Sequence, residues 1–106
     1  DNYYLITREG DTFKALGKEI EISWRKLAKY NERDKNDVLH RGEVIYLKKK
    51  RKKAPKQYKN RPHIVRNGES MYTISQKYGI RLKYLYKMNN FDVDHQIKIG
   101  DRIRIR

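Results

Sequence analysis

Five carboxylates are the side chains of this sequence with the most obvious capacity for chemistry. They lie in two parts of the chain and are Asp11, Asp34, Asp37, Glu69 and Asp92. Two carboxylates on either side of a sugar can hydrolyse a glycosidic bond, provided that an enclosed cleft raises the pKa of one of them. A chain of 106 residues in which 38 % are charged has little apolar material from which to build such a cleft. We therefore expect solvated carboxylates and no enzymatic activity from this chain alone.

Metal chemistry is not favoured either. The chain has no cysteine, which excludes thiolate ligands and disulfides. Its three histidines, His40, His63 and His95, share no spacing typical of metal ligands. We expect no metal site and no other cofactor.

Positive charge is concentrated in one run, KKKRKKAPKQYKNR, which begins at Lys48 and ends at Arg61. This run carries nine Lys or Arg residues and no acid, whereas residues 1–47 carry nine charges of each sign. Dense like charge around Pro55 favours an extended, mobile linker. Two alternatives stay open, attraction to anionic polymers and binding of nucleic-acid phosphates, and the second is the less favoured.

The segments that would position these residues occur twice in the sequence, as an internal repeat. The phrase REGDTFKAL at residues 8–16 returns as RNGESMYTI at residues 66–74. An offset of 58 aligns residues 6–48 with residues 64–106 without a gap, and ten aligned pairs are identical. The identical residues include two glycines and an asparagine of each copy, so a biased composition does not explain them. Two copies of one small fold are therefore expected.

Each copy has the signals of a β-α-α-β unit. An extended piece (residues 4–7 or 63–66) precedes a glycine turn, and Thr12 or Ser70 can cap the helix that follows. Apolar residues at helical spacing continue into a second helix, which ends at Asn31 or Asn89. A closing strand at residues 44–47 or 102–105 is expected to pair antiparallel with the first. The predicted fold class is α+β, with two small domains at residues 1–48 and 62–106 joined by residues 49–61.

The first copy departs from the common pattern. Gly17 lies inside its first helix, where glycine costs about 1 kcal/mol relative to alanine. Glu21 stands where Gly79 is expected to end the corresponding helix of the second copy with a left-handed cap. At the start of the next helix, Arg81 replaces the capping residue that Ser23 supplies in the first copy. We expect the first copy to be the less regular of the two.

Residues 62–106 resemble a LysM domain. The motif is long and ordered, with VRNGES at the first turn, then YGI, LYKMN and IKIGD before the final strand RIRI. Residues 4–48 resemble a second, more divergent LysM domain, so the resemblance covers 45 residues in each copy. The pair is also similar to the C-terminal tail of cell-wall glucosaminidases from Bacteroidota-type bacteria.

The resemblance implies a βααβ module that binds N-acetylglucosamine-containing glycan, either peptidoglycan or chitin, along a shallow groove. This groove lies between the strand-to-helix turn and the loop after the second helix. In the second copy it implies Asn67, Gly68, Glu69, Ser70, Met71 and Tyr72, facing Asn90, Phe91, Asp92 and Ile97. In the first copy it implies Glu9, Gly10, Asp11, Thr12, Phe13 and Lys14, facing Glu32, Arg33, Asp34 and Leu39.

Several of these residues have a structural alternative. Phe13, Met71 and Phe91 either touch sugar or pack in the core, and the sequence leaves this open. Trp24 could be a sugar platform, but it lies at helical spacing with apolar neighbours, which favours core packing. Arg33 replaces the apolar Phe91, so the first copy is expected to be a weaker or differently tuned binder.

The favoured interpretation is a peptidoglycan-binding tail that holds an attached cell-wall hydrolase on its substrate. The alternative is a nucleic-acid-binding protein that acts through residues 48–61. In the first case the same run would attract anionic envelope polymers. We expect a monomer in the bacterial cell envelope or outside the cell, with its export signal outside this sequence. No apolar run approaches the length of about 18 residues that crosses a membrane, so no membrane span is expected.

Overall fold

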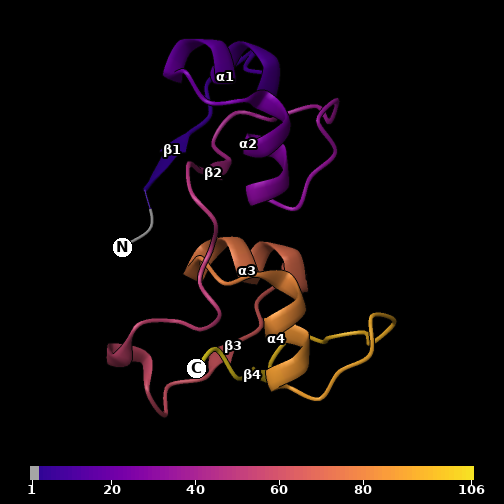
Figure 1. The fold of residues 1–106 in the computed structure, drawn as a ribbon. Coiled ribbons are helices and arrows are strands. Elements are labelled where there is room, and N and C mark those ends of the chain that lie inside the picture. The colour runs from indigo at the N-terminus through magenta and orange to yellow at the C-terminus, as the bar shows by residue number, and fades with distance from the viewer. Residues whose placement is uncertain (1–2) are drawn as a thin grey trace. The chain divides into compact units, whose positions relative to one another are not determined.

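The computed structural model describes residues 3–106 and divides the chain into two compact units, Asp1–Lys50 and Arg51–Arg106 (Figure 1). The first unit contains strand β1 (Tyr4–Ile6), helices α1 (Phe13–Ile20) and α2 (Trp24–Tyr30), and strand β2 (Val44–Tyr46). The second unit contains β3 (His63–Ile64), α3 (Met71–Tyr78), α4 (Leu82–Met88) and β4 (Arg102–Ile103), preceded by a short 3-10 helix, η1 (Lys56–Tyr58). The predicted order of elements is therefore confirmed in both copies.

In each unit the two strands pair antiparallel and the two helices pack beside them. Tyr4 lies opposite Tyr46 in the first unit, and His63 lies opposite Ile103 in the second. Each unit has its own core. The first core consists of Phe13, Leu16, Leu27, Ala28, Leu39 and Ile45, and the second of Ala54, Val65, Met71, Ile74, Ile80, Leu85, Ile103 and Ile105.

The hydroxyl caps predicted at the two glycine turns are confirmed. The Thr12 Oγ1 atom accepts a hydrogen bond of 3.1 Å from the Ala15 N–H group. In the second unit the Ser70 hydroxyl accepts from the Thr73 N–H group at 3.1 Å, and the Thr73 hydroxyl accepts from the Ser70 N–H group at 2.8 Å. This reciprocal box fixes the α3 start more firmly than the single bond at α1. The cap expected from Ser23 is wrong, since its side chain makes no capping bond, and Arg81, where no hydroxyl cap was expected, makes none either.

Both first helices end with a left-handed residue, as predicted for Gly79. Gly79 has a φ of 68°, and Glu21 has a φ of 59° at the matching position. Glutamate carries a Cβ atom that strains this conformation, whereas glycine adopts it without strain. The fold therefore imposes the same turn on both copies although only one sequence suits it.

Replacing Glu21 with glycine is accordingly expected to stabilise the first unit by about 1 kcal/mol. Glu21 is exposed and its side chain makes no ion pair in the described part of the chain, so nothing is lost with it. Chemical unfolding, followed by the fluorescence of Trp24, measures the stability of this unit, because Trp24 is the single tryptophan of the chain. An unchanged or lower unfolding midpoint would show that the Glu21 backbone is not strained.

The charge of the basic segment predicts an extended, mobile linker, but residues 51–61 pack in the second unit and Lys50 is buried in the first. The Arg51 N–H group donates to Gly79 O at 2.8 Å, and Arg51 O accepts from the Arg81 N–H group at 2.8 Å. Ala54 is fully buried in the second core, and its N–H group donates to Ile105 O at 2.8 Å. Charge patterning could not predict this, because residues 51–61 are attached by backbone groups and by one small apolar side chain, while Lys52, Lys53 and Lys56 face solvent.

Candidate functional site

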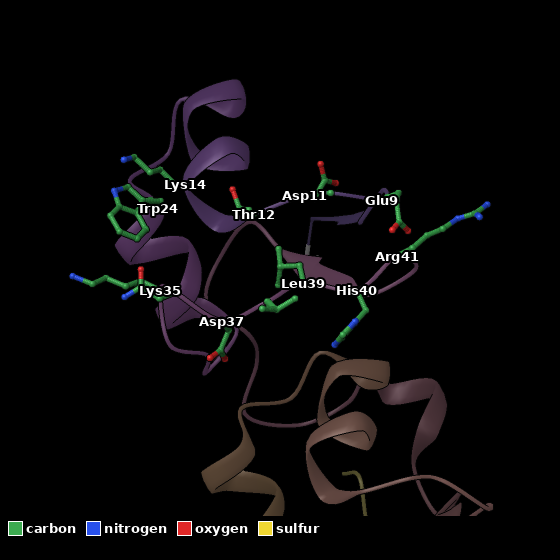
Figure 2. A pocket seen from close by; sticks show the side chains of 13 residues that line it. Glu9, Asp11, Thr12, Lys14, Trp24, Lys35, Asp37, Leu39, His40 and Arg41 are labelled. Atoms are coloured by element: carbon green, nitrogen blue, oxygen red, sulfur yellow. The ribbon is translucent and has the colours of Figure 1, made fainter.

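A hollow of about 620 Å³ lies on the first unit between the turn before α1 and the loop after α2 (Figure 2). Residues 9–12 and Lys14 form one wall, and residues 35–41 form the other. Trp24 at the start of α2 also lines it. In Figure 2 the side chains of Lys14 and Trp24 lie at one end of the hollow, and those of Glu9 and Arg41 lie at the other. These two walls lie in the strand-to-helix turn and in the loop after α2, and of the four residues predicted in that loop only Leu39 lines the hollow.

The structure divides the residues predicted for this groove into two groups. Those that line the hollow are Glu9, Gly10, Asp11, Thr12, Lys14 and Leu39. Phe13 is fully buried in the core and does not line the hollow. Glu32 forms an ion pair with the ammonium group of Lys50, and an Asp34 carboxylate oxygen accepts the Asn36 N–H group at 2.8 Å.

Arg33 braces the loop wall and does not line the hollow. Its Nε atom donates to Asp37 at 2.8 Å, and its two terminal nitrogens donate to Glu43 at 2.8 Å and to Val38 O at 3.0 Å. The other oxygen of Glu43 accepts the His40 N–H group at 2.6 Å. One guanidinium thus ties the loop at three points, as its planar fork of donors allows.

The second unit braces the matching loop with aromatic rings. Phe91 and His95 occupy the positions of Arg33 and Asp37 in the repeat, and their rings stack with centroids 3.7 Å apart and planes 12° apart. Asp101 repeats the role of Glu43 by accepting the Lys98 N–H group at 2.9 Å. The same loop is therefore held by charge in one copy and by ring stacking in the other.

The residues predicted for the second groove range from exposed to buried. The exposed ones are Asn67, Gly68, Ser70, Asn90 and Asp92, and the half-buried ones are Glu69, Tyr72, Phe91 and Ile97. Met71 is only 4 % exposed and belongs to the core, as Phe13 does in the first unit. Phe91 and Ile97 pack against the same core, and each keeps part of its surface accessible.

Comparison with known proteins identifies the family to which both units belong. The LysM domain family matches residues 6–48 and again residues 63–106. This chain belongs to the LysM family. The expected tandem pair and its α+β class are confirmed, and LysM domains are non-catalytic modules that bind glycans containing N-acetylglucosamine.

Two solved structures are similar to the tandem LysM chain, and no curated protein sequence matches it significantly. They are crystal structures of the spore cortex-lytic enzyme SleL from Bacillus cereus and from Bacillus megaterium QM B1551. The first has 22 % identity and a TM-score of 0.42, and the second has 19 % identity and a TM-score of 0.41. They cover 99 % and 98 % of this chain, which spans 22 % of each SleL chain.

The carboxylates of Asp11 and Glu69 close the turns that precede α1 and α3. Asp11 Oδ2 accepts the Arg8 N–H group at 2.7 Å, and Glu69 Oε1 accepts the Arg66 N–H group at 2.7 Å. The backbone hydrogen bond from Arg8 holds the pKa of Asp11 below its usual value. Desolvation alone would raise the pKa of Glu69, but hydrogen bonds from His63 and from the Arg66 N–H group outweigh it and lower that pKa. Both groups stay ionised, which is the opposite of what a glycosidase acid needs.

Acid is therefore expected to weaken the first LysM unit through Asp11. A carboxylate whose folded pKa is lowered stabilises the fold above its unfolded pKa, and that stability is lost as the pH falls through the folded pKa. Asn at position 11 still accepts from Arg8 but does not titrate, so Asp11→Asn should flatten the loss of unfolding midpoint between about pH 5 and pH 3. Glu9→Gln is the matched control, since Glu9 lies in the same turn without contacting Arg8. Equal acid sensitivity of the Asp11 variant and the parent chain would contradict this.

Several residues that line the hollow of the first unit are not among those predicted for the groove, although Trp24 was considered as a sugar platform. They are Trp24, Lys35, Asn36, Asp37, Val38, His40 and Arg41. Trp24 is half-buried, packs against the first core and also lines the hollow, so both of its alternative roles are open to it. The repeat carried a signal for the others, because residues 35–41 align with residues 93–99 around Ile97. Among residues 3–106 there is no cluster of potential metal ligands, and no helix is long and apolar enough to cross a membrane.

Proposed function

We propose that this tandem LysM chain binds N-acetylglucosamine-containing glycan, with peptidoglycan as its main target, and holds an attached cell-wall hydrolase on that insoluble polymer. The observation that carries the proposal is the hollow between residues 9–14 and residues 35–41 of the first unit. Its size suits a short stretch of sugar rings, since ligand sites of this kind measure about 300–1,000 Å³.

The chemistry of this hollow suits an N-acetyl group, which has one donor, one acceptor and one methyl. The Lys14 N–H group at the start of α1 has no acceptor among the described residues, so it can donate to the acetyl carbonyl. Carbonyl groups of the facing loop can accept the amide proton. Val38, which is 71 % exposed, and the edge of Trp24 offer apolar surface to the methyl and to the sugar face.

Two weak sites in one chain explain why the module is duplicated. When both units engage one glycan strand, the second binding event is intramolecular and its effective concentration is high. Each groove can then be shallow and still retain the chain on a polymer. The different loop braces of the two copies, Arg33 with Asp37 and Phe91 with His95, support two grooves of unequal affinity.

Titration with a chitooligosaccharide, followed by amide NMR, tests the sugar site. We expect saturable shifts at residues 9–14 and 35–41 and at residues 67–72 and 90–97, together with retention of the chain on purified peptidoglycan. Because neutral hydrogen bonds carry the binding, added salt should change it little. Shifts confined to residues 48–61, or no retention on peptidoglycan, would contradict the proposal.

Removing the exposed valine should weaken the first groove selectively. Val38→Ser deletes apolar surface in the hollow. We expect the affinity for the chitooligosaccharide, measured from the shifts of residues 9–14, to fall about fivefold. Ile6→Ser is the matched control, because Ile6 is 52 % exposed on β1 and does not line the hollow. An equal effect of the two substitutions would place the sugar elsewhere.

The attached hydrolase and the envelope location are separate parts of the proposal. They are supported by the specificity of the LysM family for glycans that contain N-acetylglucosamine, the polymer class that cell-wall hydrolases cut. Reading the full coding region tests them. A glucosaminidase or amidase domain in the same polypeptide is the expected finding, and a full protein with no hydrolase domain would overturn this part alone.

A further inference from the structure

A second hollow, of about 660 Å³, lies on the second unit away from its predicted glycan groove. It is formed by the segment around η1 and by the last residues of the chain. Its charged side chains are Lys53, Lys56, Lys59, Arg61, Arg104 and Arg106, and no acidic residue lines it. None of the residues predicted for the glycan groove lies in it, so the two surfaces are distinct.

Backbone groups hold the two sides of this hollow together. The Ala54 N–H group donates to Ile105 O at 2.8 Å, and Arg106 Nη1 donates back to Ala54 O at 2.7 Å. Arg104 Nε donates to Arg106 O at 3.0 Å. The two arginine side chains are thus positioned by main-chain oxygen atoms of Ala54 and Arg106.

The positive charge of the hollow is not compensated within the unit. In the part of the chain that the structure describes, none of its six cations forms an ion pair with an Asp or Glu side chain. Clustered like charges repel one another and raise the local concentration of anions. A ligand with several negative groups would relieve that repulsion, and Arg forks match carboxylates in a bidentate manner.

The remaining lining distinguishes between kinds of polyanion. Tyr58 and Pro62 are half-buried and add apolar surface among the cations. Tyr58 is the single aromatic residue of the lining, and its ring packs at 80° against Tyr78 with centroids 5.3 Å apart. Sites for single-stranded nucleic acid instead offer several aromatic faces on which bases stack. Cations mixed with apolar surface fit a short peptide that carries carboxylates.

We propose that the hollow at residues 53–62 and 104–106 is a binding site for an acidic peptide. Such a peptide can be the carboxylate-bearing side chain of peptidoglycan or an acidic segment of a protein. The site adds recognition of peptide to recognition of sugar within one LysM unit, and it does not depend on the glycan groove.

Fluorescence anisotropy with the full chain tests the proposal. The probes are a labelled Ala-Glu-Glu-Ala peptide, its Ala-Gln-Gln-Ala counterpart, a soluble disaccharide-peptide from peptidoglycan and an oligothymidylate, all at one ionic strength. We expect the glutamate peptide to bind at least about tenfold tighter than the glutamine peptide. The tighter of the glutamate peptide and the disaccharide-peptide identifies the source. Tighter binding of oligothymidylate than of both would overturn the proposal in favour of a phosphate site.

Two triple variants separate the hollow from the overall positive charge. Lys53, Lys56 and Lys59 are exposed, so their joint replacement by Gln should leave the fold intact and weaken the glutamate peptide about tenfold. The matched control replaces Lys77, Lys83 and Lys87, which are exposed on α3 and α4 outside the hollow, and should change binding less than about twofold. Equal losses of affinity for the glutamate peptide in the two triple variants would show general charge attraction and overturn the proposed site. Chitooligosaccharide binding should survive both triples, so the failure of this proposal and of the glycan proposal are distinguishable.

Discussion

Replacing Asn31 with alanine is expected to destabilise the first LysM unit by about 3 kcal/mol. Asn31 is fully buried at the end of α2. Its Nδ2 group donates to Leu27 O at 2.8 Å and to Tyr46 O at 2.9 Å, and its Oδ1 atom accepts the Tyr46 N–H group at 2.7 Å. The side chain therefore acts as a short strand that pairs with β2 from the helix side.

The expected loss is large because the three bonds are removed together from a buried place. Each buried polar group deprived of its partner costs about 1–3 kcal/mol, and small domains have about 5 kcal/mol of stability in total. Asn31→Asp should be as damaging as Asn31→Ala, since it removes both donors and brings a carboxylate into the core. Urea unfolding followed by Trp24 fluorescence measures both variants.

The second unit supplies the matched control. Asn89 donates to Leu85 O and Arg104 O, both at 2.8 Å, and accepts the Arg104 N–H group at 2.7 Å. Asn89 is half-buried and Arg104 is exposed, so water can replace part of what is lost. Asn89→Ala is therefore expected to cost the second unit only about 1 kcal/mol. If Asn31→Ala lowers the free energy of unfolding no more than Asn89→Ala does, burial does not increase the contribution of these hydrogen bonds to stability.

This asparagine also shows how much of the fold was predictable. The repeat identified Asn31 and Asn89 as helix ends, and local chemistry predicted the hydroxyl caps at Thr12 and Ser70 and the left-handed Gly79. Such signals act within one turn of the chain, where a residue type dictates its own backbone. The hydrogen bonds from Asn31 to β2 span 15 residues, and no local pattern reports them.

The candidate sites show the same division. The repeat and the resemblance identified the turn and the loop in which the hollow of the first unit lies, because turn and loop positions follow from the order of elements. The roles of single side chains inside those segments were harder to predict. Arg33 looked like a lost sugar contact and is a loop brace, since its three acceptors come together only in the folded loop. The basic segment was predicted to be a mobile linker because its many lysines dominate the sequence pattern, and one alanine among them gave no sign that Ala54 is buried.

Gly17 is the clearest case in which packing reverses a local rule. Helix propensity predicts that alanine at position 17 would stabilise α1 by about 1 kcal/mol. A Cβ atom at this position would lie 2.7 Å from Ile22 O and 2.9 Å from Trp24 Cβ, closer than real contacts allow. Gly17 thus permits the close approach between α1 and the start of α2, and its matched residue Ser75 is buried as well.

We therefore expect Gly17→Ala to destabilise the first unit by about 2 kcal/mol in spite of its better helix propensity. Overpacking costs about 1–3 kcal/mol, and the upper end applies because a backbone oxygen and a Cβ atom cannot rotate away as the end of a flexible side chain can. The propensity gain of about 1 kcal/mol offsets part of this. Ala15→Gly is the control for propensity alone, since Ala15 is exposed on the same helix and should lose about 1 kcal/mol. Urea unfolding and the emission wavelength of Trp24 report both variants, and a more stable Gly17→Ala would mean that the two helices can separate without loss. In that case glycine at this position would reflect neither packing nor helix formation.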